Sequence, residues 1–210
     1  IVGRGVDIEQ FSPDHYSQNL RQQWGVNSDT KVLLYVGRLS PEKEIDVLIN
    51  AYIAMRRINK TNIKLVIVGD GPERSHLEMI AQGQDVIFTG TLTGLKLAQA
   101  YASANIFVFA SQVETFGNVV LEAMASGLPI IAYNYACAHL HVKQGETGWL
   151  SPLGNISGLI QSMYQLPDNG QLKQMGIQAR KNVQHVGWQY PVHQFEQALY
   201  GVAMEMHMTS

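Results

Sequence analysis

Short runs of apolar residues recur along the chain, and each ends at a glycine or at another small or polar residue. The runs are continuous rather than alternating, and they cover residues 32–36, 65–68, 86–88, 106–109 and 129–132. Continuous runs of this length are typical of strands that are buried on both faces of a sheet. We therefore predict five strands of a parallel sheet.

Segments of helical period lie between these runs. From Ile45 to Ile58, apolar residues recur at spacings of three and four. Spacing of this kind, with proline in a first turn and glycine after a last turn, predicts further helices over 72–81, 95–102, 118–126, 155–166, 171–186 and 192–206. Strands that alternate with helices predict an α/β fold, a Rossmann-like open parallel sheet with helices on both faces and additional C-terminal helices.

The chain divides into three predicted regions. Residues 1–28 form a linker with a short helix, residues 29–190 form the Rossmann-like domain, and residues 191–210 form a C-terminal helix that follows a break. Ligands of open α/β sheets bind off the carboxyl ends of the strands. This rule selects the segments that follow the predicted strands, at 37–43, 69–72, 90–94, 111–118 and 133–138.

Composition and charge exclude several classes of protein. The chain has 210 residues, of which 46% are hydrophobic. One large domain of this size can bury a sufficient core without disulfide bonds or structural metals. A net charge of −2 argues against a dedicated nucleic-acid surface. The single cysteine, Cys137, excludes a disulfide scaffold and fits a reducing compartment. No apolar run approaches the ~18 residues of a membrane span.

Arg38 and Lys43 follow the first predicted strand, in the segment Gly37–Lys43. Arginine offers a bidentate fork and lysine a mobile point charge, so two cations at a strand end suit a diphosphate. A solvated basic loop, paired with Glu42 and Glu44, explains the same residues.

Glu114 and Glu122 flank the start of the predicted helix at position 118. Gly117 and Asn118 lie where backbone N–H groups point out of a predicted helix N-terminus, an arrangement that suits an anion, and glycine permits a close approach. Glu122 lies one turn further in and can reach hydroxyls beside a phosphate. Alternatively, Glu114 is an ordinary loop acid. Because the neighbours of Glu122 are apolar, its carboxylate is either partnered or functional.

Two other patterns are interpreted structurally. The turn Gly69–Pro72 has Arg74 where a dinucleotide fingerprint needs a third glycine, so we interpret it as a tight strand-to-helix turn. His139 and His141 lack a completing cluster of cysteines or acids, so no metal site is predicted.

The motifs together resemble a known family. The chain is similar to the C-terminal, donor-binding half of retaining GT-B fold glycosyltransferases of the group 1 (family 4) type. The resemblance spans residues 2–200 and is carried, in order, by Gly37–Lys43, Gly69–Pro72, Phe88–Gly90, Glu114–Glu122 and Ala123–Ala132. Within the family, the segments Val2–Asp7, Phe11–Pro13 and Ala132–Ala136 are similar to GDP-mannose-dependent α-mannosyltransferases.

The resemblance implies a reaction. A hexose, mannose in the branch just named, would pass from a GDP- or UDP-linked sugar to a lipid or glycan acceptor with retention at the anomeric carbon. The nucleotide sugar is the substrate, and neither a cofactor nor a metal is implied. The full-length protein would be cytoplasmic, or peripheral to the inner face of a membrane, with membrane contact only through the half that this chain lacks.

The resemblance also implies roles for individual residues. Arg38 and Lys43 would hold the donor diphosphate, and with Glu114 they form the implied catalytic set. Glu114 would contact the transferred sugar, and Glu122 would bind the ribose hydroxyls. The remaining implied donor-binding residues are Gly37, Gly90, Thr91, Leu92, Phe116, Gly117 and Asn118. Fixed cations and a helix N-terminus would stabilise the leaving diphosphate.

The sequence departs from the family in two places. Position 44 is glutamate where glycine or asparagine is common, and we expect its charge to weaken the positive field of the preceding lysine. After the fifth predicted strand, many relatives have a glycine pair and then an acid. This chain has Ala136–Ala138 and then Leu140.

A larger departure is length. We expect the N-terminal acceptor half to be absent from this chain, which would then bind nucleotide but transfer no sugar. Three alternatives remain open from the sequence: a nucleotide-sugar 2-epimerase, a glycan phosphorylase on the same fold, or a non-catalytic nucleotide-binding domain.

Overall fold

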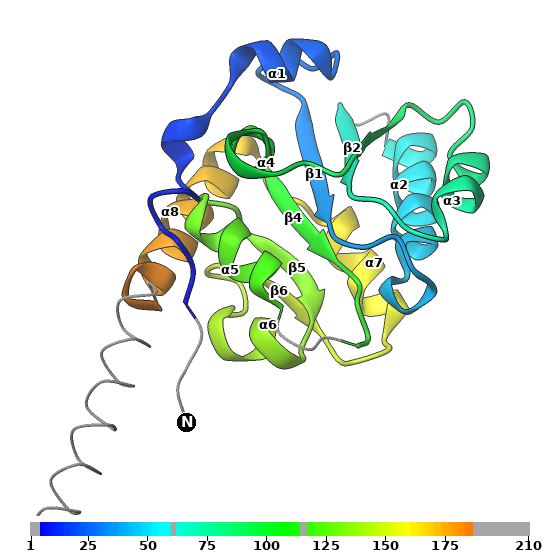
Figure 1. Ribbon diagram of the computed structural model, residues 1–210. Helices are drawn as coiled ribbons and strands as arrows, with labels where there is room; N and C mark the ends of the chain where they lie inside the picture. Colours follow the sequence, from blue (N-terminus) through cyan, green and yellow to red (C-terminus); the bar gives the residue numbers. More distant parts are fainter. Residues whose placement is uncertain (1–4, 60–61, 114–116, 187–210) are drawn as a thin grey trace, which may run out of the picture.

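A computed structural model describes residues 5–59, 62–113 and 117–186 of the chain. Its centre is one six-stranded sheet in which every paired strand runs parallel to its neighbour. The strands are β1 (Lys31–Val36), β2 (Ile63–Val68), β3 (Val86–Gly90), β4 (Ile106–Phe109), β5 (Ile130–Tyr133) and β6 (Gly148–Ser151). Their order across the sheet is β3-β2-β1-β4-β5-β6 (Figure 1). The predicted Rossmann-like fold is confirmed.

Helices cover both faces of the sheet. The α-helices are α1 (Gln18–Gln23), α2 (Ile45–Asn59), α3 (Arg74–Ile80), α4 (Gly94–Ala102), α5 (Asn118–Ala125), α6 (Ala136–His141), α7 (Ile156–Tyr164) and α8 (Asn169–Val183). Short 3₁₀ turns are η1 (Pro13–His15), η2 (Pro41–Lys43) and η3 (Gln184–Val186). On one face α2 contacts α3 and α7, and on the other α5 contacts α8 (Figure 1).

The core lies where the two central strands pair. In β1 and β4, side chains such as Leu34, Phe107 and Val108 are fully buried, as the continuous apolar runs predict. Fully buried Leu48, on α2, and Ala123, on α5, belong to the same core. The central strands are therefore packed from both faces.

The N-terminal segment is packed against the domain. The guanidinium of Arg180, on α8, donates hydrogen bonds to the carbonyl oxygens of Ile8 (3.2 Å) and Phe11 (3.0 Å), and also to Ala125 at the end of α5. The backbone N–H of Val6 donates to the carbonyl of Val186 at 3.0 Å. Residues 6–11 are therefore tied to α8 and its neighbour α5, and η1 contacts α4. The division of the chain into three regions stays a prediction.

The structure corrects the predicted elements in two places. The sixth strand, β6, was not predicted, because Gly148, Trp149, Leu150 and Ser151 form no continuous apolar run, and the two middle residues are half-buried. Residues 136–138, predicted as loop, begin the short helix α6. The predicted helix over 192–206 lies outside the described residues.

Candidate functional site

The loops after β1 and β4 meet at the topological switch point of the sheet. From β1 the chain moves to β2 and β3 on one side, and from β4 it moves to β5 and β6 on the other. Helices cannot cover the carboxyl end between these two strands, so a crevice opens there in doubly wound folds. The candidate residues Gly37–Lys43 and Ser111–Val113 leave the sheet on the two sides of this point.

Lys43 joins the two loops. It ends the turn η2, and its Nζ donates hydrogen bonds to Ser111 Oγ (3.1 Å) and to the carbonyl oxygen of Val113 (2.9 Å) after β4. The ammonium also lies 5.8 Å from the centre of the Phe109 ring, within cation–π range. Residue 43 therefore places a positive charge at the switch point, held by contacts from the opposite loop.

Arg38 has a different environment. Its side chain is exposed just after β1, where a guanidinium can turn toward a ligand. A hydrogen bond from Ser40 Oγ (2.6 Å) lowers the pKa of the Glu42 carboxyl, and the charges of Lys43 and Arg38 lower it further. The two cations thus share one electrostatic neighbourhood with Glu42, as the solvated-loop interpretation also expects.

Backbone hydrogen bonds join the loops after β1, β2 and β3. The N–H of Gly37 donates to the carbonyl of Val68, and the N–H of Gly69 donates to the carbonyl of Gly90, at 3.0 and 2.9 Å. A Cβ at Gly69 would lie 1.9 Å from the carbonyl oxygen of Gly37, and a Cβ at Gly71 would lie 2.2 Å from that of Leu39. The predicted structural role of the Gly69–Pro72 turn is confirmed, because only glycine permits this approach.

The N-terminus of α5 is the predicted anion site. Gly117 is left-handed (φ 66°), and a Cβ there would lie 2.7 Å from the Cβ of Cys137, so both its conformation and its packing require glycine. The side-chain oxygen of Asn118 is buried without a hydrogen-bond partner. A buried acceptor left unpaired costs free energy unless a ligand or water satisfies it.

Glu122 lies one turn further along α5 and is partnered. The hydroxyl of Tyr101, on α4, donates to its Oε2 at 2.9 Å. Burial raises the pKa of the Glu122 carboxyl above its ordinary value, and the hydrogen bond from Tyr101 lowers it in part. Glu122 lines a groove of about 360 Å³ together with Asn118, Thr93, Gly94, Leu97, Gly5, Val6, Asp7, Gln10 and Phe11.

Glu44 belongs to a second partnered group. Its backbone is left-handed (φ 47°), a conformation that asparagine and glycine adopt more easily. Its Oε2 accepts a hydrogen bond of 2.7 Å from the hydroxyl of Tyr133, and its other oxygen accepts one from Gln112 Nε2. The carboxylate that we expected to weaken the field of Lys43 is thus held by two donors from the other side of the crevice.

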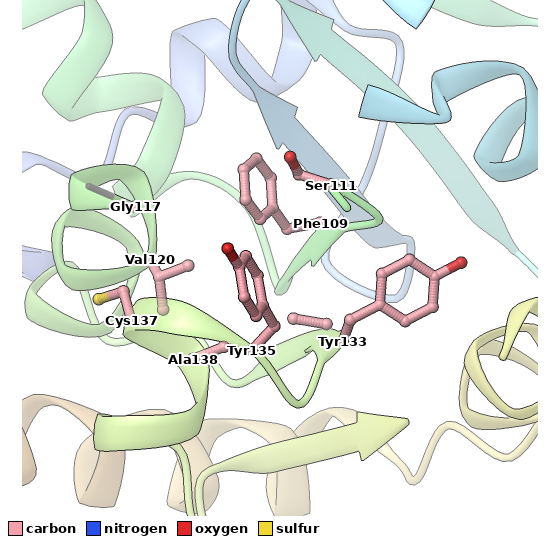
Figure 2. A pocket seen from close by; sticks show the side chains of 9 residues that line it. Phe109, Ser111, Gly117, Val120, Tyr133, Tyr135, Cys137 and Ala138 are labelled. Atoms are coloured by element: carbon pink, nitrogen blue, oxygen red, sulfur yellow. The ribbon is translucent and has the colours of Figure 1, made fainter. Parts of the chain in front are cut away.

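A small cavity lies beside these residues, between the ends of β4 and β5 and the starts of α5 and α6. Its volume is about 10 Å³, enough for one water. Phe109 and Tyr135 lie across it from one another, whereas the ring of Tyr133 turns away from Cys137 (Figure 2). Ala136, at the start of α6, has φ 47°, which explains why glycine suits this position.

The structure thus brings most of the predicted residues to one edge of the sheet. Gly90 ends β3, and Thr91 and Leu92 follow directly after it. The other described residues of the set come after the carboxyl end of β1 or β4: Gly37, Arg38, Lys43, Gly117, Asn118 and Glu122. Glu114 and Phe116 lie outside the described residues. Sequence reasoning missed Tyr101, Tyr133 and Gln112, because no local motif marks a residue whose partner lies 21 to 89 positions away.

The described residues lack two kinds of site. They contain no group of three or more His, Cys, Asp or Glu side chains arranged to hold a metal ion. Within the same residues, every helix falls short of the length and apolar character needed to cross a bilayer.

Comparison with known proteins agrees with this geometry. The family model described as "Glycosyl transferases group 1" matches residues 17–182. The chain belongs to the group 1 glycosyl transferases. In this group 1 chain, Arg38 and Lys43 follow β1, and Glu122 lies one turn inside α5.

Two curated relatives match the group 1 domain over most of its length. The chain is 32% identical to Sulfoquinovosyl transferase SQD2 of Arabidopsis thaliana, over 97% of the chain and 40% of that protein. It is 38% identical to a GDP-mannose-dependent alpha-mannosyltransferase of Mycobacterium tuberculosis, over 79% of the chain and 40% of that protein. The group 1 chain therefore spans about two fifths of the length of these relatives.

A solved structure supports the same fold assignment. Anabaena Alr3699/HepE, crystallised in complex with UDP and glucose, superposes on this chain with a TM-score of 0.79 at 26% identity. The superposition covers 94% of this chain and 55% of the other. The described group 1 domain thus corresponds to about half of that solved chain.

Proposed function

We propose that this chain binds the nucleoside diphosphate part of a sugar donor at the switch-point crevice. In the full-length protein, the domain would be the donor half of a hexosyltransferase that acts with retention on a lipid or glycan acceptor. The observation that carries the proposal is Lys43, whose ammonium joins the loops after β1 and β4. Its partner Ser111 lines the same small cavity as Gly117, the residue before α5.

The chemistry at this edge suits a leaving diphosphate. The exposed guanidinium of Arg38 can bind two phosphate oxygens at once, and Lys43 adds a charge that its neighbours hold in place. The dipole at the start of α5 favours negative charge there. Groups fixed before the reaction stabilise charge as it develops, without a cost of reorganisation.

Similarity supports the class of donor. One relative is named for its use of GDP-mannose, and one solved neighbour holds UDP and glucose. For this chain we propose a GDP- or UDP-linked hexose, with Glu122 at the ribose and Glu114 at the transferred sugar. The single cysteine fits the reducing cytoplasm that we propose as its location.

Calorimetric titration of GDP and UDP against the 210-residue chain tests the proposal. We expect at least one nucleotide to bind, and Arg38→Ala to weaken it by about 10- to 150-fold, since a charge-assisted contact contributes about 1.5–3 kcal/mol. Arg57→Ala is the matched control, because this exposed arginine lies in the last turns of α2, at the opposite edge of the sheet. Absence of heat with both nucleotides would contradict the proposal, and an unchanged affinity in Arg38→Ala would contradict the phosphate assignment.

The donor's base and sugar can be assigned by thermal shift. A ligand that binds only the folded state raises its melting temperature, and at equal concentration a tighter ligand raises it more, because the stabilisation grows with the logarithm of concentration over Kd. A panel of GDP- and UDP-linked hexoses should contain one nucleotide sugar that raises the melting temperature more than its free nucleotide does. If every nucleotide sugar gives the same shift as its nucleotide, the proposed sugar subsite is contradicted in this domain.

A further inference from the structure

Tyr101 is a fully buried tyrosine whose hydroxyl donates to the Glu122 carboxylate at the edge of the groove. It lies on α4, 21 positions before the acid that it contacts. Its ring is fixed edge-on by Phe11 at a centroid distance of 5.6 Å and packs against Phe107 of β4 at 5.8 Å. The hydroxyl is therefore held at one place relative to α5.

We propose that Tyr101 is the positioning residue for Glu122, which it fixes through Oε2 so that Oε1 serves the sugar hydroxyls of the bound nucleoside. This inference rests on the proposed function, because it assigns the groove beside Glu122 to the nucleoside of the donor. The groove contains acceptors that suit a diol: the Glu122 carboxylate and the unpartnered Asn118 oxygen. A diol donates two hydrogen bonds, and one rigid carboxylate can accept both.

Few groups near Glu122 can stabilise its ionised carboxylate. Among the described residues that line the groove, the other titratable group is Asp7 of the N-terminal segment, whose Oδ1 accepts from the backbone N–H groups of Glu9 and Gln10. From α4, the titratable group that faces Glu122 is Tyr101 itself. None of the described groove residues is a lysine, arginine or histidine. The Tyr101 hydroxyl is thus the donor that favours the ionised acid, against the cost of burial.

Tyr101→Phe separates positioning from packing, because it keeps the ring and removes only the hydroxyl. We expect GDP or UDP, whichever binds the wild type, to bind about 2- to 10-fold more weakly at pH 7, the effect of one hydrogen bond. Affinity should fall as pH falls through the pKa of Glu122. Because the variant loses a hydrogen bond to the ionised form, this fall should occur at higher pH than in the wild type.

Ribose analogues give the readout that a packing role would not move. The wild type should prefer GDP or UDP over the 2′,3′-dideoxy analogue, and Tyr101→Phe should lose most of that preference. Tyr52→Phe is the matched control, since Tyr52 is also fully buried but its hydroxyl donates to the carbonyl of Asp85 (3.2 Å), at the other end of the sheet. This control should keep the preference and the pH midpoint. Glu122→Gln should lose the pH dependence.

The following results would overturn the positioning role, or the proposed function on which it rests. Equal losses for the ribonucleotide and its dideoxy analogue in Tyr101→Phe, or an unchanged pH midpoint, overturn the positioning role. If the wild type binds neither GDP nor UDP, the proposed function fails and this inference fails with it. If Tyr101→Phe folds poorly, a measurement without ligand at low temperature still tests the proposal. Carboxyl ¹³C titration should give a higher pKa for Glu122 in the folded variant than in the wild type. An unchanged pKa rejects the hydrogen-bond argument.

Discussion

The hydroxyl of Tyr133 lies 2.7 Å from Oε2 of Glu44 and donates a hydrogen bond to it across the carboxyl edge of the sheet. Tyr133 ends β5, and Glu44 follows the turn that carries Lys43. Gln112, after β4, donates to the other carboxylate oxygen. Three loops around the crevice are thus joined through one acid, immediately next to the lysine at the switch point.

The pair of Tyr133 and Glu44 should make the stability of the protein depend on pH in the alkaline range. Burial raises the pKa of Tyr133 well above its ordinary value, and the Glu44 carboxylate raises it further. Stability from such a group is full below the unfolded pKa of about 10 and is lost as pH rises above it. Tyr133→Phe should therefore reduce the fall in unfolding free energy above pH 10 by up to about 1.4 kcal/mol per pH unit. Urea denaturation between pH 9 and 11 measures the slopes, and identical slopes would contradict the pair.

The two cations should differ in their effect on stability. Arg38 is exposed, whereas Lys43 donates to Ser111 Oγ and to the Val113 carbonyl. Arg38→Ala should leave the melting temperature of the ligand-free chain within about 1 °C. Lys43→Ala should lower it by about 2–6 °C, from the loss of about 1–1.5 kcal/mol of hydrogen bonding. Both variants should bind nucleotide more weakly, and equal melting temperatures would show that the Lys43 contacts do not stabilise the fold.

The close approach at Gly71 predicts a steric effect. A Cβ there would lie 2.2 Å from the carbonyl oxygen of Leu39, a backbone atom that cannot move without shifting the loop after β1. Gly71→Ala should destabilise the chain by about 3 kcal/mol or more, at the upper end of overpacking costs, and should weaken nucleotide binding. Gly170→Ala, on α8, is the control, because its Cβ would meet only the Asp168 side chain at 3.2 Å. Equal stability of the two variants in denaturant melts would refute the close packing.

The buried charge of Glu122 should lower the stability of the fold while it favours nucleotide binding. Burial raises the pKa of its carboxyl in the folded state, so the stability that this group contributes is present below its unfolded pKa and lost as pH rises through the folded value. Glu122→Gln avoids the buried charge and can still accept from Tyr101. The variant should be more stable than wild type at pH 7, by about 1.4 kcal/mol for each unit of the shift, and should match it near pH 4. Weaker nucleotide binding should accompany the gain. A variant that is less stable at pH 7 would contradict the burial argument.

The sequence by itself determined the sheet and the edge at which the site lies. Runs such as 32–36 and 106–109 are continuous because their strands are buried on both faces, and this pattern is visible without a structure. The loops at Gly37–Lys43 and Ser111–Asn118 were predicted from the rule for carboxyl ends, because chain direction alone places them there. Strand β6 was not predicted because its pattern is short and its two middle residues are half-buried.

Tertiary structure decided which side chains hold the site residues. Tyr101 and Tyr133 look like ordinary apolar positions in sequence, and only folding brings their hydroxyls to Glu122 and Glu44. A hydrogen bond depends on two atoms meeting within about 3 Å at a suitable angle, whereas a local pattern records only which residues lie near one another along the chain. The order of the sheet puts β4 beside β1 and β5 beside β4, despite the two strands between β1 and β4 in sequence, and so brings the end of β5 near the segment after β1.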